Sequence, residues 1–211
     1  MAHEVVLVAD DHPLFRSALS VATLRAAPTA QILEAGNVAE AIERLRAAPR
    51  IDLVLLDLRM PDAVGFSGVA TLHAEAPTVP IIVVSAAEGE AAGARRFGAA
   101  AFLSKTAPLA SIEMTVRDTL AGIRVLDAAI TDDETDAMAA GIAALTPAQL
   151  KILIAMLGGR LNKQIAHDVG SSEATVKAHV TVILRKLGVQ NRTQAVIAAR
   201  ALGLDAVDRA A

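Results

Sequence analysis

The chain has 211 residues and a net charge of −3, with 54% hydrophobic but only 2% aromatic residues. This length allows one large or two small domains, with cores built from Ala, Val, Leu and Ile. The absence of cysteine excludes disulfides and thiolate metal sites. No apolar run approaches the roughly 18 residues that span a bilayer, and the first residues lack the layout of a signal peptide. We therefore expect a cytoplasmic protein without a membrane segment.

The charge is distributed unevenly along the chain. Residues 1–125 hold 11 basic and 14 acidic residues, a net charge of −3. Residues 126–145 hold no basic and five acidic residues, a net charge of −5. Residues 146–211 hold nine basic and four acidic residues, a net charge of +5. A basic C-terminal segment suggests an interaction surface for a polyanion. The acidic segment 126–145 is rich in alanine without a strong apolar period, so we predict a linker there between two domains.

Within residues 1–125, short apolar runs alternate with amphipathic ones. Helices are predicted from Pro13 and near 38–46, 65–76, 88–96 and 109–121, the fourth being weak because it contains Gly89 and Gly93. The predicted strands are 5–9, 32–35, 53–57, 79–85 and 101–103. Residues 53–56 are apolar at every position, which is typical of a parallel strand covered by helices on both faces. We predict an α/β domain with a doubly wound, five-stranded parallel sheet.

Acidic residues follow two of these strands. Asp10 and Asp11 end the first strand and Asp57 ends the third. The carboxyl ends of parallel strands bind ligands, and strands one and three can be neighbours in a doubly wound sheet. Three adjacent carboxylates repel one another unless a cation lies among them, and oxygen ligands favour Mg²⁺. A bound metal would let a carboxylate act as nucleophile toward a phosphoryl group.

Two further polar residues follow the next strands. Ser85 ends the fourth strand, and Lys105 follows the fifth. A lone strand-end Ser or Lys is more often simply solvated. The order Asp-Asp, Asp, Ser, Lys at successive strand ends instead indicates a site where a hydroxyl and an ammonium bind phosphoryl oxygens.

Residues 146–211 are predicted to form an all-α domain of four helices. Thr146, Pro147 and Gln149 are typical of a capping box at the start of the first helix, and glycines end the first three. The others are expected at 162–169, at 172–187 and from Thr193. Two helices joined by a short glycine turn, the second of them basic, are typical of a helix-turn-helix. A basic helix face is usually only solvated, but the preceding helix and the charge of +5 favour nucleic acid here.

These motifs carry a resemblance to a known family. Residues 1–122 resemble the receiver domain of bacterial response regulators, which has the flavodoxin-like or CheY-like fold, and residues 146–211 resemble the LuxR-type helix-turn-helix. The whole chain resembles the NarL/FixJ family. The receiver motifs are Val8-Ala9-Asp10-Asp11-His12-Pro13, Leu56-Asp57-Leu58-Arg59-Met60-Pro61 with Gly65, Ser85-Ala86, and Phe102-Leu103-Ser104-Lys105. One departure is Val64, where the family often has an acid.

The resemblance implies roles for the residues of the receiver. A sensor histidine kinase would phosphorylate Asp57. Ser85 and Lys105 would bind the phosphoryl group, and Phe102 would be the aromatic switch that moves with Ser85. Mg²⁺ would be held by Asp10, Asp11, Asp57 and the backbone carbonyl of Arg59.

The resemblance also implies DNA contacts. The matching segments are 162–166 and 172–180, and they place Lys163, Thr175, Lys177 and His179 on double-stranded promoter DNA, mostly against phosphates. Ala178 and Thr181 are too short to reach far, so the bases that are recognised stay open. The protein would bind as a homodimer, with RNA polymerase as a further partner.

The expected dimer contact is an apolar stripe of the last helix, Val196, Ile197, Ala199 and Leu202. This stripe is small, so we expect the receiver to assist dimerisation. Before phosphorylation the receiver is expected to cover part of the DNA-binding segment.

An aspartyl-nucleophile enzyme, such as a haloacid-dehalogenase-like phosphatase, is the alternative. That class needs an acid two residues after the nucleophile to protonate the leaving group. Arg59 occupies this position. We therefore predict a phosphorylation-controlled transcription factor rather than an enzyme.

Overall fold

The computed structural model describes residues 3–123 and 133–206. Its N-terminal half holds one parallel sheet in the order β2-β1-β3-β4-β5. The strands are β1 Val5–Ala9, β2 Gln31–Ala35, β3 Leu53–Asp57, β4 Ile81–Ser85 and β5 Ala101–Ser104. The predicted doubly wound sheet is confirmed, and the order makes β3 a neighbour of β1.

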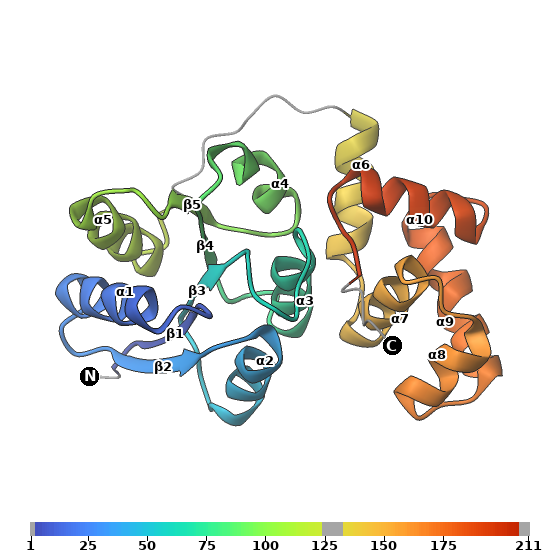
Figure 1. Cartoon of the computed structure of the whole chain (residues 1–211), viewed down its shortest axis with the longest axis horizontal. Helices are drawn as coiled ribbons and strands as arrows, with labels where there is room; N and C mark the ends of the chain where they lie inside the picture. Colours follow the sequence, from blue (N-terminus) through green and yellow to red (C-terminus); the bar gives the residue numbers. More distant parts are fainter. Residues whose placement is uncertain (1–2, 124–132, 207–211) are drawn as a thin grey trace.

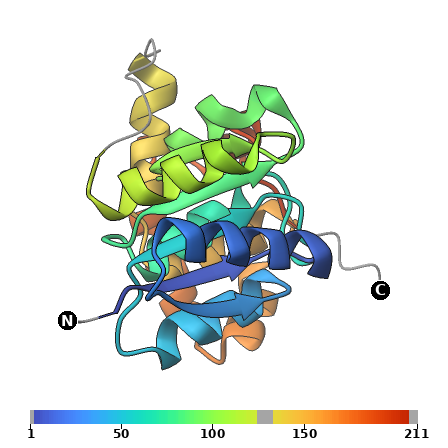
Figure 2. The same cartoon turned by 90° about the vertical axis from the view of Figure 1, so that its left-hand side faces the viewer.

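Helices cover both faces of this sheet. They are α1 Pro13–Ala26, α2 Val38–Ala47, α3 Ser67–Glu75, α4 Ala91–Arg96 and α5 Leu109–Leu120, with a 3₁₀ turn, η1 Glu88–Glu90, before α4. Helices α1 and α5 lie side by side on one face, and α2, α3 and α4 lie on the other (Figures 1 and 2). Every residue of β3 and β4 is buried, as expected of apolar strands between two helical layers.

The C-terminal half contains the four predicted helices, α7 Pro147–Leu157, α8 Asn162–Val169, α9 Glu173–Lys186 and α10 Arg192–Ala201. The predicted capping box is present, because Thr146 and Gln149 bond reciprocally at the start of α7. Gly170 ends α8 in the left-handed conformation. Ser172 caps α9 by accepting the Thr175 amide, at 3.1 Å. Local sequence signals therefore set these boundaries.

The acidic segment 126–145, predicted as a linker between two domains, is largely helical in its described part. Residues 133–143 form helix α6 Asp133–Ala143, while Asp127 and Asp132 lie outside the described residues. Ala139 and Ile142 are 2% and 1% exposed and belong to the apolar core. Helix α6 packs against α3, α4 and α9. The small residues of α6 gave no strong apolar periodicity in the sequence. In the structure they let this helix approach its neighbours closely.

The two halves share one continuous apolar cluster. Helix α3 packs against α7 and α4 against α6 (Figure 1). Val69 and Leu72 of α3 are buried in the same cluster as Leu153 and Met156 of α7. The receiver therefore contacts the helical half through the helices that follow β3 and β4.

Four residues add a backbone contact between the halves, which we call the interdomain clasp: Gly65, Phe66, Gly203 and Leu204. Gly65 and Leu204 form an antiparallel β-bridge, and the Phe66 amide donates to the Gly203 carbonyl at 3.1 Å. Gly65 has a φ of 55°, and a Cβ there would lie 2.1 Å from the Gly203 oxygen. Only glycine fits this position without displacing the clasp.

Among the described residues, no single helix is long and apolar enough to cross a membrane. The bent pair Ala137–Ala143 and Pro147–Leu157 meets the test by length and composition only.

We expect Ile142→Ala to lower the free energy of unfolding by about 2–5 kcal/mol, the usual cost of truncating a buried aliphatic side chain. The exposed Ala140 of the same helix offers a control, because Ala140→Ser should change stability by about 0.5 kcal/mol or less. Urea unfolding followed by circular dichroism measures both. Equal stability of the two variants would show that α6 is not part of the core.

Candidate functional site

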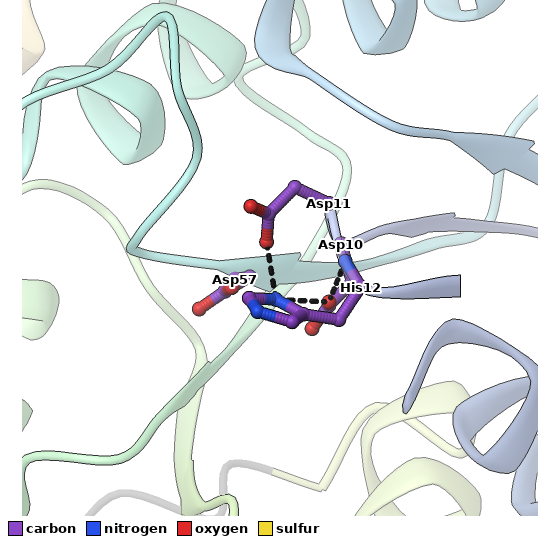
Figure 3. Close-up of side chains that lie close together, drawn as sticks. All are labelled: Asp10, Asp11, His12 and Asp57. Carbon is purple, nitrogen blue, oxygen red and sulfur yellow. Dashed lines mark hydrogen bonds and ion pairs between the residues drawn. The ribbon is translucent and has the colours of Figure 1, made fainter. Parts of the chain in front are cut away.

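The predicted acidic cluster is present at the carboxyl edge of the sheet. Asp10, Asp11, His12 and Asp57 bring ligand atoms within 4.8 Å of one another (Figure 3). Asp10 and Asp57 are 0% and 2% exposed. Asp10 Oδ1 accepts the His12 amide at 2.8 Å, and Asp57 Oδ1 accepts the Arg59 amide at 3.1 Å. Adjacent pairing of β1 and β3 places these two buried carboxylates together.

Lys105 bonds to both buried acids and offsets one of their two negative charges. Its Nζ donates to Asp10 Oδ2 at 2.8 Å and to Asp57 Oδ2 at 2.7 Å. Burial lowers the pKa of the Lys105 ammonium, but its hydrogen bonds to the two aspartates and their negative charges outweigh burial, so its pKa is raised. The Phe15 ring lies 4.7 Å from Nζ in a cation–π contact that the sequence did not indicate. Lys105 thus stays charged inside the acidic cluster.

Asp11 offers a free oxygen to the cluster. Its Oδ1 is buried and makes no hydrogen bond. His12 Nδ1 lies 2.6 Å from it, which is ion-pair distance, but the contact lacks hydrogen-bond geometry. A buried carboxylate oxygen without a hydrogen bond is costly unless a cation compensates it. The donor set of three carboxylates, one with an oxygen that makes no hydrogen bond, fits a hard divalent cation.

The predicted phosphoryl ligand Ser85 has another partner in this structure. It is fully buried, and its Oγ donates a short hydrogen bond to Glu90 Oε2. Glu90 Oε1 accepts from Arg59 Nη2 at 3.3 Å. Sequence reasoning missed Glu90, because it lies five residues after Ser85 in a turn without a recognisable pattern.

An apolar cavity of about 630 Å³ opens beside the acids. Leu14, Phe15 and Ala18 of α1 line it together with Asp57 and Lys105. The Leu14 side chain is 87% exposed. Asp57 is therefore reached from outside across an apolar surface.

Phe102, the predicted switch residue, lies on β5 opposite Val83 in the sheet register. It is partly buried and packs against the main apolar cluster. Its coupled movement with Ser85 stays a prediction.

The predicted DNA-contacting residues lie on α8 and α9. Lys163, Thr175 and Lys177 are exposed and His179 is half-buried. Lys177 Nζ pairs with Glu173 Oε1 at 3.0 Å, one turn away. Exposed pairs of this kind contribute only about 0.3–0.5 kcal/mol, so a phosphate can compete with Glu173 for the ammonium.

The receiver does not cover these exposed side chains. It contacts α6, α7 and the segment after α10 instead. It therefore covers part of residues 146–211, at α7 and after α10, and leaves the exposed side chains of α9 uncovered. That this is the arrangement before phosphorylation stays a prediction.

The predicted dimer stripe is wrong for two of its four residues. Ala199 and Leu202 are 0% and 8% exposed and belong to the chain's own core. Ile197 is 64% exposed, and Val196 is half-buried. Ile197 and Ala198 line a hollow of about 470 Å³ between the ends of α9 and α10. The exposed apolar surface of α10 is therefore narrower than its periodicity suggested.

Two family models match the chain. Residues 6–117 match the response regulator receiver domain, and residues 143–199 match the bacterial regulatory proteins of the luxR family. The first model covers the sheet with its five helices, and the second covers α7 to most of α10.

Similar proteins share this two-part organisation over nearly their full length. A glycerol metabolism activator of Pseudomonas putida is 37% identical over 207 residues, covering 92% of this chain and 94% of that one. The DNA-binding transcriptional activator DevR/DosR of Mycobacterium tuberculosis is 33% identical, with 93% and 94% covered. The solved signal receiver domain of a NarL response regulator from M. tuberculosis superposes with a TM-score of 0.50 and 32% identity, over 58% of this chain and 99% of that one.

The chain therefore belongs to the response regulators, the phosphorylation-controlled regulators of two-component systems. Within them it is of the NarL type, which joins a receiver domain to a luxR-family DNA-binding domain, and it is a DNA-binding transcriptional regulator.

We expect phosphoryl transfer to this protein to require Asp57 and a divalent metal. Asp57→Asn should accept no label from a radioactive phosphodonor, because an amide is not a nucleophile. Asp11→Ala should need about tenfold more Mg²⁺, the equivalent of roughly 1.4 kcal/mol of binding energy. Asp118→Asn on α5, outside the acidic cluster, serves as control. Undiminished labelling of the Asp57 variant would contradict the assignment.

Lys177→Ala should weaken binding to specific and non-specific DNA about equally. The slope of log affinity against log salt should fall by roughly one unit, because one phosphate contact is lost. The exposed Lys151 of α7 is the matched control, and its alanine variant should keep the parent slope. An unchanged slope for Lys177→Ala would show that this side chain does not touch the backbone.

Proposed function

We propose that a sensor histidine kinase phosphorylates Asp57 and that Asp10, Asp11, Asp57 and the Arg59 carbonyl hold Mg²⁺ during the transfer. Asp57 is the only one of the three acids at the end of β3, and its Oδ2 faces the Lys105 ammonium at 2.7 Å. That contact carries the proposal, because the ammonium already lies where phosphoryl oxygens would develop charge. A bound Mg²⁺ would supply further charge neutralisation for those oxygens.

The remaining residues of the site keep the roles expected for them. Lys105 stabilises the added phosphoryl oxygens once it has released part of its contact with Asp57. Ser85 donates its hydroxyl proton to the same group, and Phe102 adjusts to the new position of Ser85. Lys105 and Ser85 would act from the carboxyl edge of the sheet, and Phe102 from within β5.

We propose no substrate turnover. A phosphatase of the aspartyl-nucleophile class needs a general acid at position 59. Arg59 occupies that position and offers no carboxyl proton, and its guanidinium is bonded to Glu90. The site therefore accepts a phosphoryl group and loses it slowly.

For the output, we propose that the phosphorylated protein binds promoter DNA in the cytoplasm as a homodimer, where it also meets RNA polymerase. Lys163, Thr175, Lys177 and His179 contact the DNA. The domain division 1–125, 126–145 and 146–211 is kept, with α6 as a packed element inside the middle segment.

We further propose that the docked arrangement is the inactive form. The interdomain clasp holds Gly203 and Leu204, directly after α10. Helix α10 carries Ile197, the exposed apolar side chain best placed for a dimer contact. Phosphorylation at Asp57 would release the clasp through the loop after β3 and free α10 to pair.

A phosphoryl analogue and a clasp variant test this proposal together. Full-length protein should bind DNA much better with beryllofluoride than without it. Gly65→Ala should raise the DNA affinity measured without the analogue by about tenfold. This corresponds to a loss of roughly 1.4 kcal/mol in the stability of the docked form. The control is Gly36→Ala, because a Cβ there meets its nearest atom at 3.6 Å. Equal affinity of the parent with and without beryllofluoride would refute control of DNA binding by Asp57.

A further inference from the structure

Ser85 cannot serve two acceptors at once. Its hydroxyl carries one proton, and it therefore donates one hydrogen bond at a time. In this structure the acceptor is Glu90. We infer that Glu90 is a positioning residue, which holds the Ser85 hydroxyl in the unphosphorylated protein. A phosphoryl group on Asp57 then displaces Glu90 from that hydroxyl. This inference rests on the proposed phosphorylation of Asp57.

The contacts of Glu90 define the form that precedes phosphorylation. Its Oε2 accepts from Ser85 Oγ, and its Oε1 accepts from Arg59 Nη2 at 3.3 Å. The Ala87 amide donates to the same Ser85 Oγ at 3.3 Å. We call Arg59, Glu90 and Ser85 the Ser85 latch. It joins the loop after β3 to the loop after β4 by side chains alone.

Charge makes the latch responsive to phosphorylation. A phosphoryl group adds a charge of about −1.5 to −2. The Glu90 carboxylate is also negatively charged, and it lies close to Ser85, the proposed ligand of the phosphoryl group. The two acceptors compete for one proton and repel each other. The partner that retains Glu90 is weak, because the Arg59 side chain is 68% exposed and solvent screens the pair. Glu90 therefore leaves at little cost once the Ser85 proton turns to the phosphoryl group.

Release of Glu90 acts on the start of α4. Glu90 is the last residue of η1 and the N-cap of α4. Helix α4 packs against α6, and a Cβ on Gly93 would lie 2.2 Å from the Phe66 ring. Phe66 belongs to the interdomain clasp. The contacts thus run from Ser85 through Glu90 and α4 to the surface that holds the helical half.

Helix α4 is short enough to have two arrangements. It has only six residues, and Gly93 in its interior lowers its intrinsic stability. The 3₁₀ turn before it and the weak cap leave its first turn dependent on the latch. This is the two-state element that both Asp57 and the interdomain clasp would bias.

A beryllofluoride titration in saturating Mg²⁺, followed by the Ala87 amide resonance, tests the latch. Glu90→Ala should reach half-saturation at about tenfold less beryllofluoride than the parent, the scale of one hydrogen bond to a charged group. Glu90→Gln keeps the shape of the side chain but loses its charge. Its half-saturation concentration of beryllofluoride should therefore lie between those of the parent and of Glu90→Ala. Mg²⁺ affinity measured without beryllofluoride should stay at the parent value. Glu113→Gln on α5 is the matched control and should match the parent in both titrations.

A double-mutant cycle separates the latch from a simple charge effect. In the Ser85→Ala background, Glu90→Ala should give much less than a tenfold gain, because no hydroxyl is left to release and only the charge repulsion is removed. A tenfold gain in that background, or no gain for Glu90→Ala in the parent background, would overturn the latch. If the parent itself gives no beryllofluoride response, the proposed phosphorylation fails and the latch fails with it.

Discussion

The N-terminal half depends on keeping two buried carboxylates in one place. Asp10 and Asp57 are almost fully buried, and Lys105 bonds to both. Removing Lys105 would leave both carboxylates buried without a compensating charge, which costs about 3–5 kcal/mol. The phosphoryl role proposed for Lys105 uses the same ammonium. One side chain would then serve both the stability of the site and the proposed reactivity of Asp57.

The loops that follow β3 and β4 connect this site to the rest of the molecule. The first carries Arg59, Gly65 and Phe66, and the second carries Glu90. Phe66 stacks on Phe97 with ring centroids 5.5 Å apart, and its amide holds Gly203. Packed neighbours thus connect the loop that follows Asp57 with the helical half.

Contact between the halves leaves the proposed DNA surface accessible. Thr175 and Lys177 of α9 are exposed, whereas the chain after α10 is held by the receiver. The regulation proposed above therefore acts on how two copies pair and not on access to the DNA-contacting side chains. Ile197 remains on the surface as an apolar contact that a single copy does not use.

The sequence by itself determined the strands, the helices α7 to α10 and the acidic cluster, because each depends on local signals. Apolar runs specify buried strands, Thr146 and Ser172 cap their helices, and acids at the ends of β1 and β3 meet in a parallel sheet. Only the tertiary structure decided the packing of α6, the pairing of Glu90 with Ser85 and the burial of Ala199. The burial of Ile142 and Ala199 depends on helices from other parts of the chain, which the periodicity of their own helix does not reveal. The partner of Ser85 depends on the turn that precedes α4. Side-chain contacts of this kind follow from how the elements pack, which the pattern of a single segment does not contain.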